Sequence, residues 1–219
     1  MNNYTTRETY IMYHKKIYWF LCYVFRVVCY MSYVNAAIEA VDKNAASWRK
    51  NKIALFWEGE NGEKKKYTFL ELSILSNKFA NLLKEKGVNR GDRVFFFLPR
   101  VPEIFYGFLG TLKRGAIAGT MFSAFGPQAI EDRLGNSDAI FVLTTEGLKP
   151  RIMSVKKNLP NLKNVMTIES AEFQKLMAST PDYYHIAQTH QEDPAFMLYT
   201  SGTTGKPKGV VHVHKAIYH

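Results

Sequence analysis

Apolar residues follow two periods along this chain, one typical of helices and the other of strands. From Val34 to Trp48 they recur at steps of three and four residues, which places them on one face of a helix. From Val94 to Leu98 every residue is apolar, as expected for a strand in a parallel sheet that helices cover on both faces. The chain therefore predicts helices and strands that pack against each other in layers.

A long helix is expected between Thr68 and Gly87. Thr68 and Glu71 are spaced as a capping box, in which a hydroxyl and a carboxylate satisfy free N–H groups at the start of a helix. Gly87 stands where this helix should end, because glycine readily takes the left-handed conformation that closes many helices. The buried face of the helix is expected to hold Leu72, Leu75, Phe79, Leu82 and Leu83.

The same alternation continues to the end of the chain. Ile53–Trp57 is expected to form a strand, and Glu58–Lys66 a hairpin-like turn that leads to Tyr67. Repeated strand–helix units of this size imply an α/β fold with a doubly wound, mainly parallel sheet and flanking helices. The further strands are expected at Ala116–Met121, Ala139–Leu143, Val165–Ile168, Ala195–Tyr199 and Val210–Val213, and the further helices after Pro102, at Gln128–Asn136, after Glu146 and near Ala171–Met177.

Residues 1–33 do not follow this pattern. The run Ile17–Val34 is apolar and aromatic and follows two lysines, as a secretory signal or a membrane anchor would. Arg26 interrupts the run, no small-residue cleavage site follows it, and its uninterrupted length is below the roughly 20 residues of a membrane span. Residues 1–33 are therefore interpreted as an atypical N-terminal extension, with a membrane role as the alternative, and residues 34–219 as the folded domain.

The formal charge of +10, from 29 Lys and Arg against 19 Asp and Glu, narrows the choice of partners. Such an excess is compatible with nucleic acid, anionic lipid or a phosphorylated small molecule. The basic residues are scattered, and no nucleic-acid-binding motif surrounds their dense runs at Lys64–Lys66, Lys156–Lys157 and Lys206 with Lys208. We therefore expect a phosphorylated small molecule and no nucleic acid.

Cysteine and histidine give little sign of a metal site. The two cysteines, Cys22 and Cys29, form neither a CxxC pair nor a disulfide framework, so a reducing, cytoplasmic setting is expected. His212 and His214 are two residues apart on an expected strand and would point to one face, a spacing that can bind a metal. No cysteine or carboxylate lies near them in the sequence. Packing or pocket-edge histidines are the favoured interpretation, and no metal site is predicted.

The strongest chemical signal is the stretch TSGTTGKPKG, which lies between two apolar strands. Its three glycines let backbone N–H groups approach a ligand closely, and its hydroxyls and lysines add donors and positive charge. Such a loop suits a polyphosphate. The candidate phosphate-binding residues are Thr200, Ser201, Gly202, Thr203, Thr204, Gly205, Lys206, Lys208 and Gly209.

An ordinary flexible turn with solvated lysines is the alternative interpretation of this stretch. The stretch is not a Walker A loop, because G-x4-G-K-[ST] does not occur, and the chain has no GxGxxG dinucleotide motif. Each feature taken alone also occurs in common turns. All ten positions together, between two apolar strands, favour phosphate binding.

The run YTSGTTGKPKG at Tyr199–Gly209 resembles the signature loop of the adenylate-forming superfamily, which includes acyl-CoA synthetases, peptide-synthetase adenylation domains and luciferases. Three other stretches are similar to acetate–CoA ligases: FFLPRVPE at Phe96–Glu103, SAFGPQAIEDRLGNSDA at Ser123–Ala139 and HVHKA at His212–Ala216. The resemblance extends from about Val34 to the end of the chain. It implies a partial AMP-binding, adenylate-forming domain.

The resemblance also implies a reaction in two steps. A short carboxylate such as acetate attacks the α-phosphate of ATP to give acyl-AMP, and the thiol of CoA then displaces AMP. ATP, Mg²⁺ carried by ATP, and CoA are the implied small-molecule substrates and cofactors. Arg151, with Lys149, lies where the family brings basic residues toward CoA, although a solvated surface arginine is the alternative. Phe122 and Phe125 are candidates to flank the CoA entrance, or to belong to the core.

In the family, a lysine on a mobile C-terminal domain assists the first step, and its motif does not occur in these residues. No residue present is therefore expected to be catalytic. The chain is expected to be an N-terminal part that ends soon after the phosphate loop and requires a C-terminal part for catalysis. The alternatives are a non-catalytic remnant with at most weak nucleotide binding, and part of another adenylate-forming enzyme such as a peptide-synthetase adenylation domain.

Overall fold

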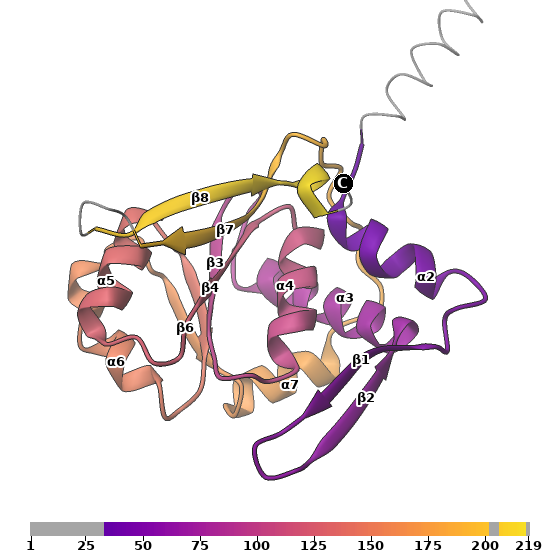
Figure 1. Ribbon diagram of the computed structural model, residues 1–219, viewed down its shortest axis with the longest axis horizontal. Helices are drawn as coiled ribbons and strands as arrows, with labels where there is room; N and C mark the ends of the chain where they lie inside the picture. The colour runs from indigo at the N-terminus through magenta and orange to yellow at the C-terminus, as the bar shows by residue number, and fades with distance from the viewer. Residues whose placement is uncertain (1–32, 202–205, 218–219) are drawn as a thin grey trace, which may run out of the picture.

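A six-stranded sheet forms the centre of the domain (Figure 1). The computed structural model describes residues 33–201 and 206–217. Five neighbouring strands of the sheet run parallel, and the sixth, at one edge, runs antiparallel to its neighbour. In spatial order the strands are β6 (Asn164–Thr167), β5 (Phe141–Thr144), β3 (Arg93–Phe97), β4 (Ile117–Met121), β7 (Pro194–Thr200) and β8 (Lys208–Val213).

Helices cover both faces of this sheet, as the sequence predicts. The helix α3 (Phe69–Glu85) packs against α4 (Glu103–Lys113) and α7 (Ala171–Ser179) on one face. The helices α5 (Pro127–Asn136) and α6 (Lys149–Met153) pack on the other face. The chain runs outward from β3 in both directions, because β4 and β5 flank it. The prediction of a doubly wound, mainly parallel α/β sheet is therefore confirmed.

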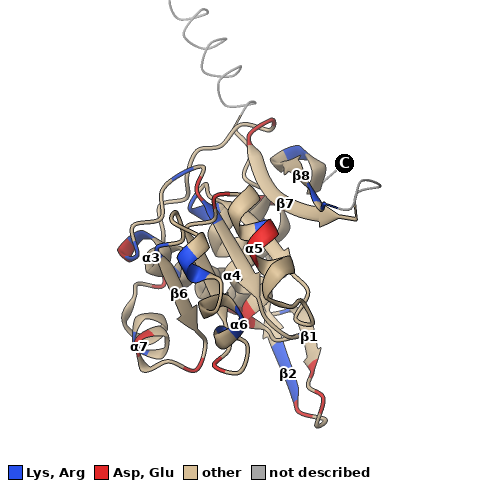
Figure 2. Ribbon diagram, turned by 90° about the vertical axis from the view of Figure 1, so that its left-hand side faces the viewer, with Lys and Arg blue, Asp and Glu red and all other residues tan. Residues whose placement is uncertain are grey.

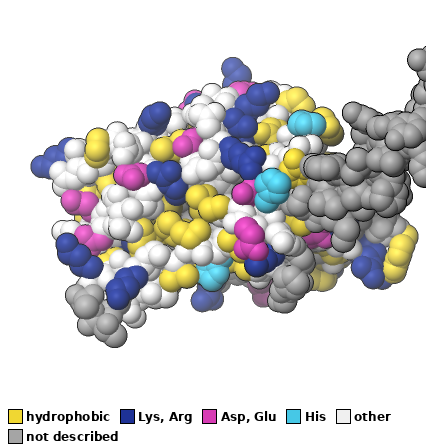
Figure 3. Space-filling view, turned by 90° about the horizontal axis from the view of Figure 1, so that it is seen from above, with side chains coloured by type: hydrophobic (Ala, Val, Ile, Leu, Met, Phe, Trp, Pro, Cys, Tyr) yellow, Lys and Arg dark blue, Asp and Glu magenta, His cyan; other side chains and the backbone are white. Residues whose placement is uncertain are grey.

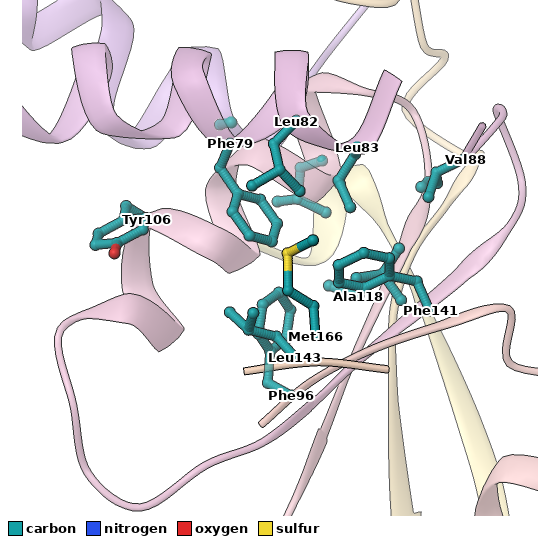
Figure 4. Close-up of a cluster of buried hydrophobic side chains, with 14 of the residues drawn as sticks. Phe79, Leu82, Leu83, Val88, Phe96, Tyr106, Ala118, Phe141, Leu143 and Met166 are labelled. Atoms are coloured by element: carbon teal, nitrogen blue, oxygen red, sulfur yellow. The ribbon is translucent and has the colours of Figure 1, made fainter. Parts of the chain in front are cut away.

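Aliphatic and aromatic side chains together fill the layer between α3 and the sheet (Figure 4). The ring centroid of Phe79 lies 6.0 Å from that of Phe96 and 6.5 Å from those of Tyr106 and Phe141. All but Tyr106 are almost completely buried. Edge-to-face and tilted contacts at such distances add to the burial of apolar area, which contributes about 1.5–3 kcal/mol for each fully buried large side chain.

The start and the end of α3 match the sequence pattern. The backbone N–H of Thr68 donates to Oε2 of Glu71 at 2.7 Å, and the N–H of Glu71 donates to Oγ1 of Thr68 at 3.2 Å, which makes a complete capping box. Gly87 closes the helix with a φ of +73°. On the buried face, Leu72, Phe79, Leu82 and Leu83 are buried as expected, and Leu75 is half-buried.

A two-stranded hairpin precedes α3 and extends away from the sheet (Figures 1 and 2). It consists of β1 (Ile53–Glu58) and β2 (Lys64–Thr68), which pair antiparallel. The strand at Ile53–Trp57 is confirmed, whereas the expected turn over Glu58–Lys66 is shorter than predicted, because Lys64–Lys66 already belong to β2. The lysines of β2 make this strand blue in Figure 2. The hairpin is joined to the sheet domain by Trp57, whose Nε1 donates to the carbonyl oxygen of Arg100 at 2.7 Å.

The prediction of one helical face from Val34 to Trp48 is wrong at its C-terminal end. The helical turns comprise η1 (Ile38–Asp42) and α2 (Lys43–Ala45), so the helix stops before Trp48 is reached. Trp48 is 74% exposed rather than buried. Its ring is instead covered by a cation, because Nζ of Lys52 lies 4.4 Å from the ring centroid.

Within residues 33–201 and 206–217, no helix is both long enough and apolar enough to cross a membrane. Most of the run Ile17–Val34 and both cysteines lie outside these ranges, so the interpretation of the N-terminal extension stays a prediction. The short connecting helices η2 (Lys156–Asn158) and η3 (His214–Ile217) complete the described elements.

A buried lysine joins three helices on the α3 face of the sheet. Lys113, on α4, is fully buried, and its Nζ donates to Oδ1 of Asp42 at 2.7 Å and to Oδ1 of Asn77 at 2.8 Å. Its third proton points at the carbonyl oxygen of Ser73, at 3.3 Å. Burial lowers the pKa of Lys113, and the carboxylate of Asp42 opposes this effect. This network fastens η1 to α3 and α4.

His214 fastens the other end of the chain to the same N-terminal helix. In Figure 1 the short yellow helix η3 lies beside the indigo segment that starts the described chain. Nδ1 of His214 accepts the backbone N–H of Ala36 at 3.1 Å, and the ring is fully buried. The sequence pattern predicted that His212 and His214 lie on one face of a strand. This prediction is wrong, because β8 ends at Val213 and His214 belongs to η3.

Breaking the Lys113 network should be costly because a buried charge would lose its partner. We expect Asp42→Leu to lower the free energy of unfolding by about 3–5 kcal/mol, and Asp42→Leu combined with Lys113→Met to restore much of this loss. Urea unfolding of both variants measures the effect. As the matched control, Lys43→Met removes an exposed ion pair with Glu39 (2.5 Å) and should change the free energy of unfolding by less than about 1 kcal/mol. Equal losses in Asp42→Leu and Lys43→Met would contradict the role given to burial.

Acid should destabilise the fold through His214. Burial and the nearby Arg90 lower the pKa of His214 to about 4, while Asp193 opposes them. The unfolded chain takes up this proton near pH 6.5, so between about pH 6.5 and 4 the unfolded state binds more protons and stability falls as the pH falls. From pH 7 to pH 5 we expect a loss of roughly 2 kcal/mol.

The variant His214→Asn tests this expectation, because the amide oxygen can accept the N–H of Ala36 without titrating. Urea unfolding at pH 7 and pH 5 should show a smaller loss in the variant than in the wild type. The same loss in both proteins would assign the acid sensitivity to other groups.

Candidate phosphate-binding site

The predicted phosphate loop connects two paired strands at the edge of the sheet. Thr200 ends β7 and lies opposite Lys208 at the start of β8. The described candidates Thr200, Ser201, Lys206, Lys208 and Gly209 are all exposed to solvent, whereas Gly202, Thr203, Thr204 and Gly205 lie outside the described residues. The strand pair thus brings hydroxyl groups from one side of the loop and ammonium groups from the other side to the same end of the hairpin.

Gly209 has a packing role that its position in the motif did not reveal. It pairs with Tyr199 across the hairpin. A Cβ atom at position 209 would lie 3.2 Å from the ring of Tyr199 and 3.3 Å from the sulfur of Met197. The ring of Tyr199 therefore covers the space that a side chain would need, and glycine keeps the two ends of the loop close together.

Tyr199 fixes the loop to the helix α5. Its hydroxyl lies 2.7 Å from Oδ1 of Asn136 and 3.1 Å from the carbonyl oxygen of Arg133, and both accept its proton. The guanidinium carbon of Arg133 lies 5.7 Å from the centroid of the Tyr199 ring. Sequence reasoning missed Arg133 and Asn136 as members of the site, since nothing in the spacing of α5 marks them.

The loop lies at the edge of the sheet where parallel strands end. In open α/β sheets, ligands bind outside the carboxyl ends of the strands, near the point where the chain changes direction. Here β4 and β7 end at this edge side by side, and β5 ends on the other side of β3. The segment 122–126 follows β4, and α6 follows β5 after a short connection. The segment that bears Phe122 and the helix α6, which bears Arg151, thus both follow strands that end at the same edge as the phosphate loop.

Arg151 holds the segment after β4 in place. Its Nη1 donates to the carbonyl oxygens of Ser123 at 2.9 Å and Phe125 at 3.3 Å. The rings of Phe122 and Phe125 meet edge to face, with centroids 6.0 Å apart. Phe125 packs against the core, which agrees with the core interpretation for this ring, whereas Phe122 is exposed and its place at a CoA entrance stays a prediction. Binding of CoA by Arg151 stays a prediction.

Two histidines that the sequence singled out lie apart from this site. The ring of His212 stacks on Phe196 with centroids 4.5 Å apart and an interplanar angle of 9°. His214 is buried beside Ala36. In the described part of the chain, no three His, Cys, Asp or Glu side chains gather as a metal site would require. The motif from Tyr199 to Gly209 contains hydroxyls and lysines but no carboxylate, a donor set that suits phosphate oxygens.

The charge around the loop is spread over the surface. Figure 3 shows Lys and Arg side chains scattered among apolar ones on the face seen from above. Val210 and Val211 of β8 and Leu198 of β7 contribute to the exposed apolar side chains of the hairpin. Lys206 and Lys208 thus place positive charge at the loop end of a strand pair whose other exposed side chains are largely apolar.

The chain matches one protein family and is similar to several known acyl-CoA synthetases. A family described as "AMP-binding enzyme" matches residues 41–219. Acetyl-coenzyme A synthetase of Bacillus subtilis (strain 168) is 42% identical in an alignment that covers 84% of this chain and 33% of that protein. The 3-hydroxypropionyl-coenzyme A synthetase of Sulfurisphaera tokodaii is 36% identical over 82% of this chain and 30% of that protein.

A solved structure agrees with these relatives. The anthranilate CoA ligase AuaEII in complex with anthranoyl-AMP has a TM-score of 0.75 and 32% sequence identity, over 84% of this chain and 34% of that chain. The chain thus spans about a third of the length of the curated relatives that it matches. Since the matched residues make up most of the chain and include the phosphate loop, the chain belongs to the family of AMP-binding enzymes, as the resemblance of its signature loop implies.

Proposed function

We propose that this chain forms the phosphate-binding part of an acyl-CoA synthetase that activates a short carboxylate, acetate in the first place. The observation that carries the proposal is the β7–β8 hairpin, which holds the ends of the signature loop together at the carboxyl edge of the sheet. Relatives named for acetyl-coenzyme A and 3-hydroxypropionyl-coenzyme A support a carboxylate as the substrate. The activity of the whole protein is part of the proposal.

The first step of the proposed reaction joins two anions. A carboxylate oxygen forms a bond to the α-phosphorus of ATP while the bond to the leaving pyrophosphate breaks. We propose that the exposed hydroxyls of Thr200 and Ser201 and the ammonium groups of Lys206 and Lys208 hold the β- and γ-phosphates, and the pairing of Thr200 with Lys208 supports this. Their interaction with the leaving group strengthens as its negative charge develops, which lowers the barrier to the reaction.

The second step transfers the acyl group to CoA. The sulfur of CoA forms a bond to the carbonyl carbon of acyl-AMP, AMP leaves with the electron pair of the broken C–O bond, and the thiol proton passes to solvent or to a base. Phe122 and Arg151 border the edge of the sheet at which the phosphate loop lies, and we propose this side as the entrance for CoA. Mg²⁺ would arrive with ATP and neutralise its phosphate oxygens.

The names of the relatives do not agree on one acyl group. Relatives and a structural neighbour are named for acetyl, 3-hydroxypropionyl and anthranilate substrates, and each of these is a carboxylate with a different side group. Phosphate chemistry is common to all of them. We propose that the remainder of the protein supplies the acyl pocket and the residues that complete catalysis. A cytoplasmic location is proposed from the two cysteines alone.

Substitutions in the loop should slow adenylation. In a chimera that joins this chain to the remaining two thirds of the Bacillus subtilis relative, we expect Lys206→Ala and Gly202→Val each to cost about 2–4 kcal/mol of transition-state stabilisation, about 30- to 1,000-fold in rate. The first removes charge facing the leaving group, and the second blocks close approach of the backbone, although Gly202 lies outside the described residues. Acetate-dependent exchange between ATP and pyrophosphate measures both.

Lys215→Ala is the matched control for charge, because Lys215 lies beyond the hairpin and pairs with Glu192. It should exchange at the wild-type rate. Wild-type rates in the two loop variants would make the loop a simple connector and overturn the proposed function.

The 219-residue chain by itself should bind ATP without turning it over. We expect no acetate-dependent release of pyrophosphate, because the chain spans only a third of the length of its relatives. Binding of ATP, measured by calorimetry, should weaken as the salt concentration rises. It should also be weaker in the double variant that combines Lys206→Ala and Lys208→Ala. Release of pyrophosphate on addition of acetate would contradict the need for a further part, and binding unaffected by the lysines would contradict the assignment of the loop.

A further inference from the structure

Arg133 contacts two aromatic rings that belong to different segments of the site. Its guanidinium carbon lies 4.1 Å from the ring centroid of Phe125 and 5.7 Å from that of Tyr199. Phe125 belongs to the segment between β4 and α5, and Tyr199 stands directly before Thr200 at the base of the phosphate loop. Both distances fall within the range of cation–π contact. One side chain on α5 therefore connects two loops that are far apart in the sequence.

Packing, rather than an ion pair, holds this guanidinium. Nη1 of Arg133 donates to the carbonyl oxygen of Ala129 at 2.8 Å, one turn earlier on α5. Its Nε is buried and has no hydrogen-bond partner within the described residues. No ion pair of Arg133 occurs in the part of the chain that the structure describes. The flat surface of the guanidinium can contact both rings, which the compact ammonium group of a lysine could not do in the same way.

Each ring is also tied to a neighbouring element. Arg151 donates to the carbonyl oxygens of Ser123 and Phe125 and so holds the backbone beneath the ring of Phe125. Tyr199 covers Gly209 across the hairpin and donates its hydroxyl to acceptors on α5. A continuous series of contacts thus runs from Arg151, through Phe125, Arg133 and Tyr199, to both ends of the phosphate loop.

We propose that Arg133 is a positioning residue that couples the segment 122–126 to the base of the phosphate loop. A shift of Phe125 changes the packing of the guanidinium, and the guanidinium changes the packing of Tyr199. Under the proposed function, on which only this consequence rests, the segment beside the CoA entrance and the loop that holds the ATP phosphates adjust together. Arg133 touches neither substrate and acts through the two rings.

Hydrogen exchange in the intact 219-residue chain tests the coupling without any ligand. The amide of Phe125, bonded to the carbonyl of Phe122 at 3.0 Å, reports on the first segment, and the amides of the paired ends of β7 and β8 report on the second. Arg133→Met keeps much of the side-chain volume and removes the planar cation. We expect this variant to exchange about tenfold faster at both places, and Arg133→Lys not to restore either.

Two further variants separate coupling from general loss of stability. Arg114→Met removes another partly buried arginine, which donates to the carbonyl oxygen of Val88 at 2.8 Å, and should leave exchange at both places unchanged. Phe125→Leu should speed exchange at the end of β7 when Arg133 is present and have no effect there in the Arg133→Met background. The proposal would be overturned if Arg133→Met sped exchange only at Phe125 or only at the ends of β7 and β8, or if it sped exchange equally throughout the sheet. It would also be overturned if Phe125→Leu sped exchange at the end of β7 as much in the Arg133→Met background as with Arg133 present.

Binding of ATP to the same variants examines the functional consequence. Phe125→Leu should weaken binding about threefold or more with Arg133 present and have no further effect without it. A wild-type chain that binds no ATP would count against the proposed function, and the exchange results would still decide the coupling. ATP affinity that responds equally to Phe125→Leu in both backgrounds would contradict the coupling.

Discussion

The pairing of β7 with its two neighbours is the constraint on which the site depends. On one side β7 runs parallel to β4, where Ala118 pairs with Phe196, and on the other side β8 returns antiparallel. The ladder between Thr200 and Lys208 brings the two ends of the loop together. Under the proposed function this matters, because backbone N–H groups that bind a phosphate are not available for hydrogen bonds within the loop.

Two glycines, one on β4 and one on β8, leave room for aromatic rings on neighbouring strands. Gly119 of β4 faces the ring of Phe95, and a Cβ there would come within 2.4 Å of the ring. Gly209 of β8 leaves the same kind of space for Tyr199. Phe95 and Tyr199 then lie with ring centroids 6.4 Å apart on the α5 face. Two large rings thus fit on the α5 face of the sheet because two glycines leave room for them.

Buried polar groups hold the two ends of the described chain against the sheet domain. Lys113 connects η1 with α3 and α4, and His214 connects η3 with the backbone at Ala36. Such groups are expensive to bury, and apolar replacements of similar shape are often as stable. Apolar surfaces can pack in several orientations. Hydrogen bonds are directional, so they fix the relative orientation of the two elements. They place the end of the loop hairpin relative to the helices that cover the sheet.

The sequence by itself determined most of the elements and their order, and it predicted the chemistry of the loop. The capping box of Thr68, the closing Gly87 and the fully apolar strand around Phe96 depend on neighbours a few positions away, and this local information is present in any stretch of the chain. The signature loop is equally local, because its resemblance to the family is carried by the consecutive residues Tyr199–Gly209, and the family match then extends over residues 41–219.

Only the tertiary structure decided which side chains support that loop. Arg133 and Tyr199 are 66 positions apart and meet because the sheet order places β7 beside β4, whose connection leads into α5. For the same reason, no periodicity could show that His214 leaves its strand to pack on Ala36, or that Trp48 lies beyond the end of its helix. Periodic patterns show which face of an element is apolar. Which element covers that face, and which polar groups meet there, depends on contacts between distant residues that form only when the whole sheet is assembled.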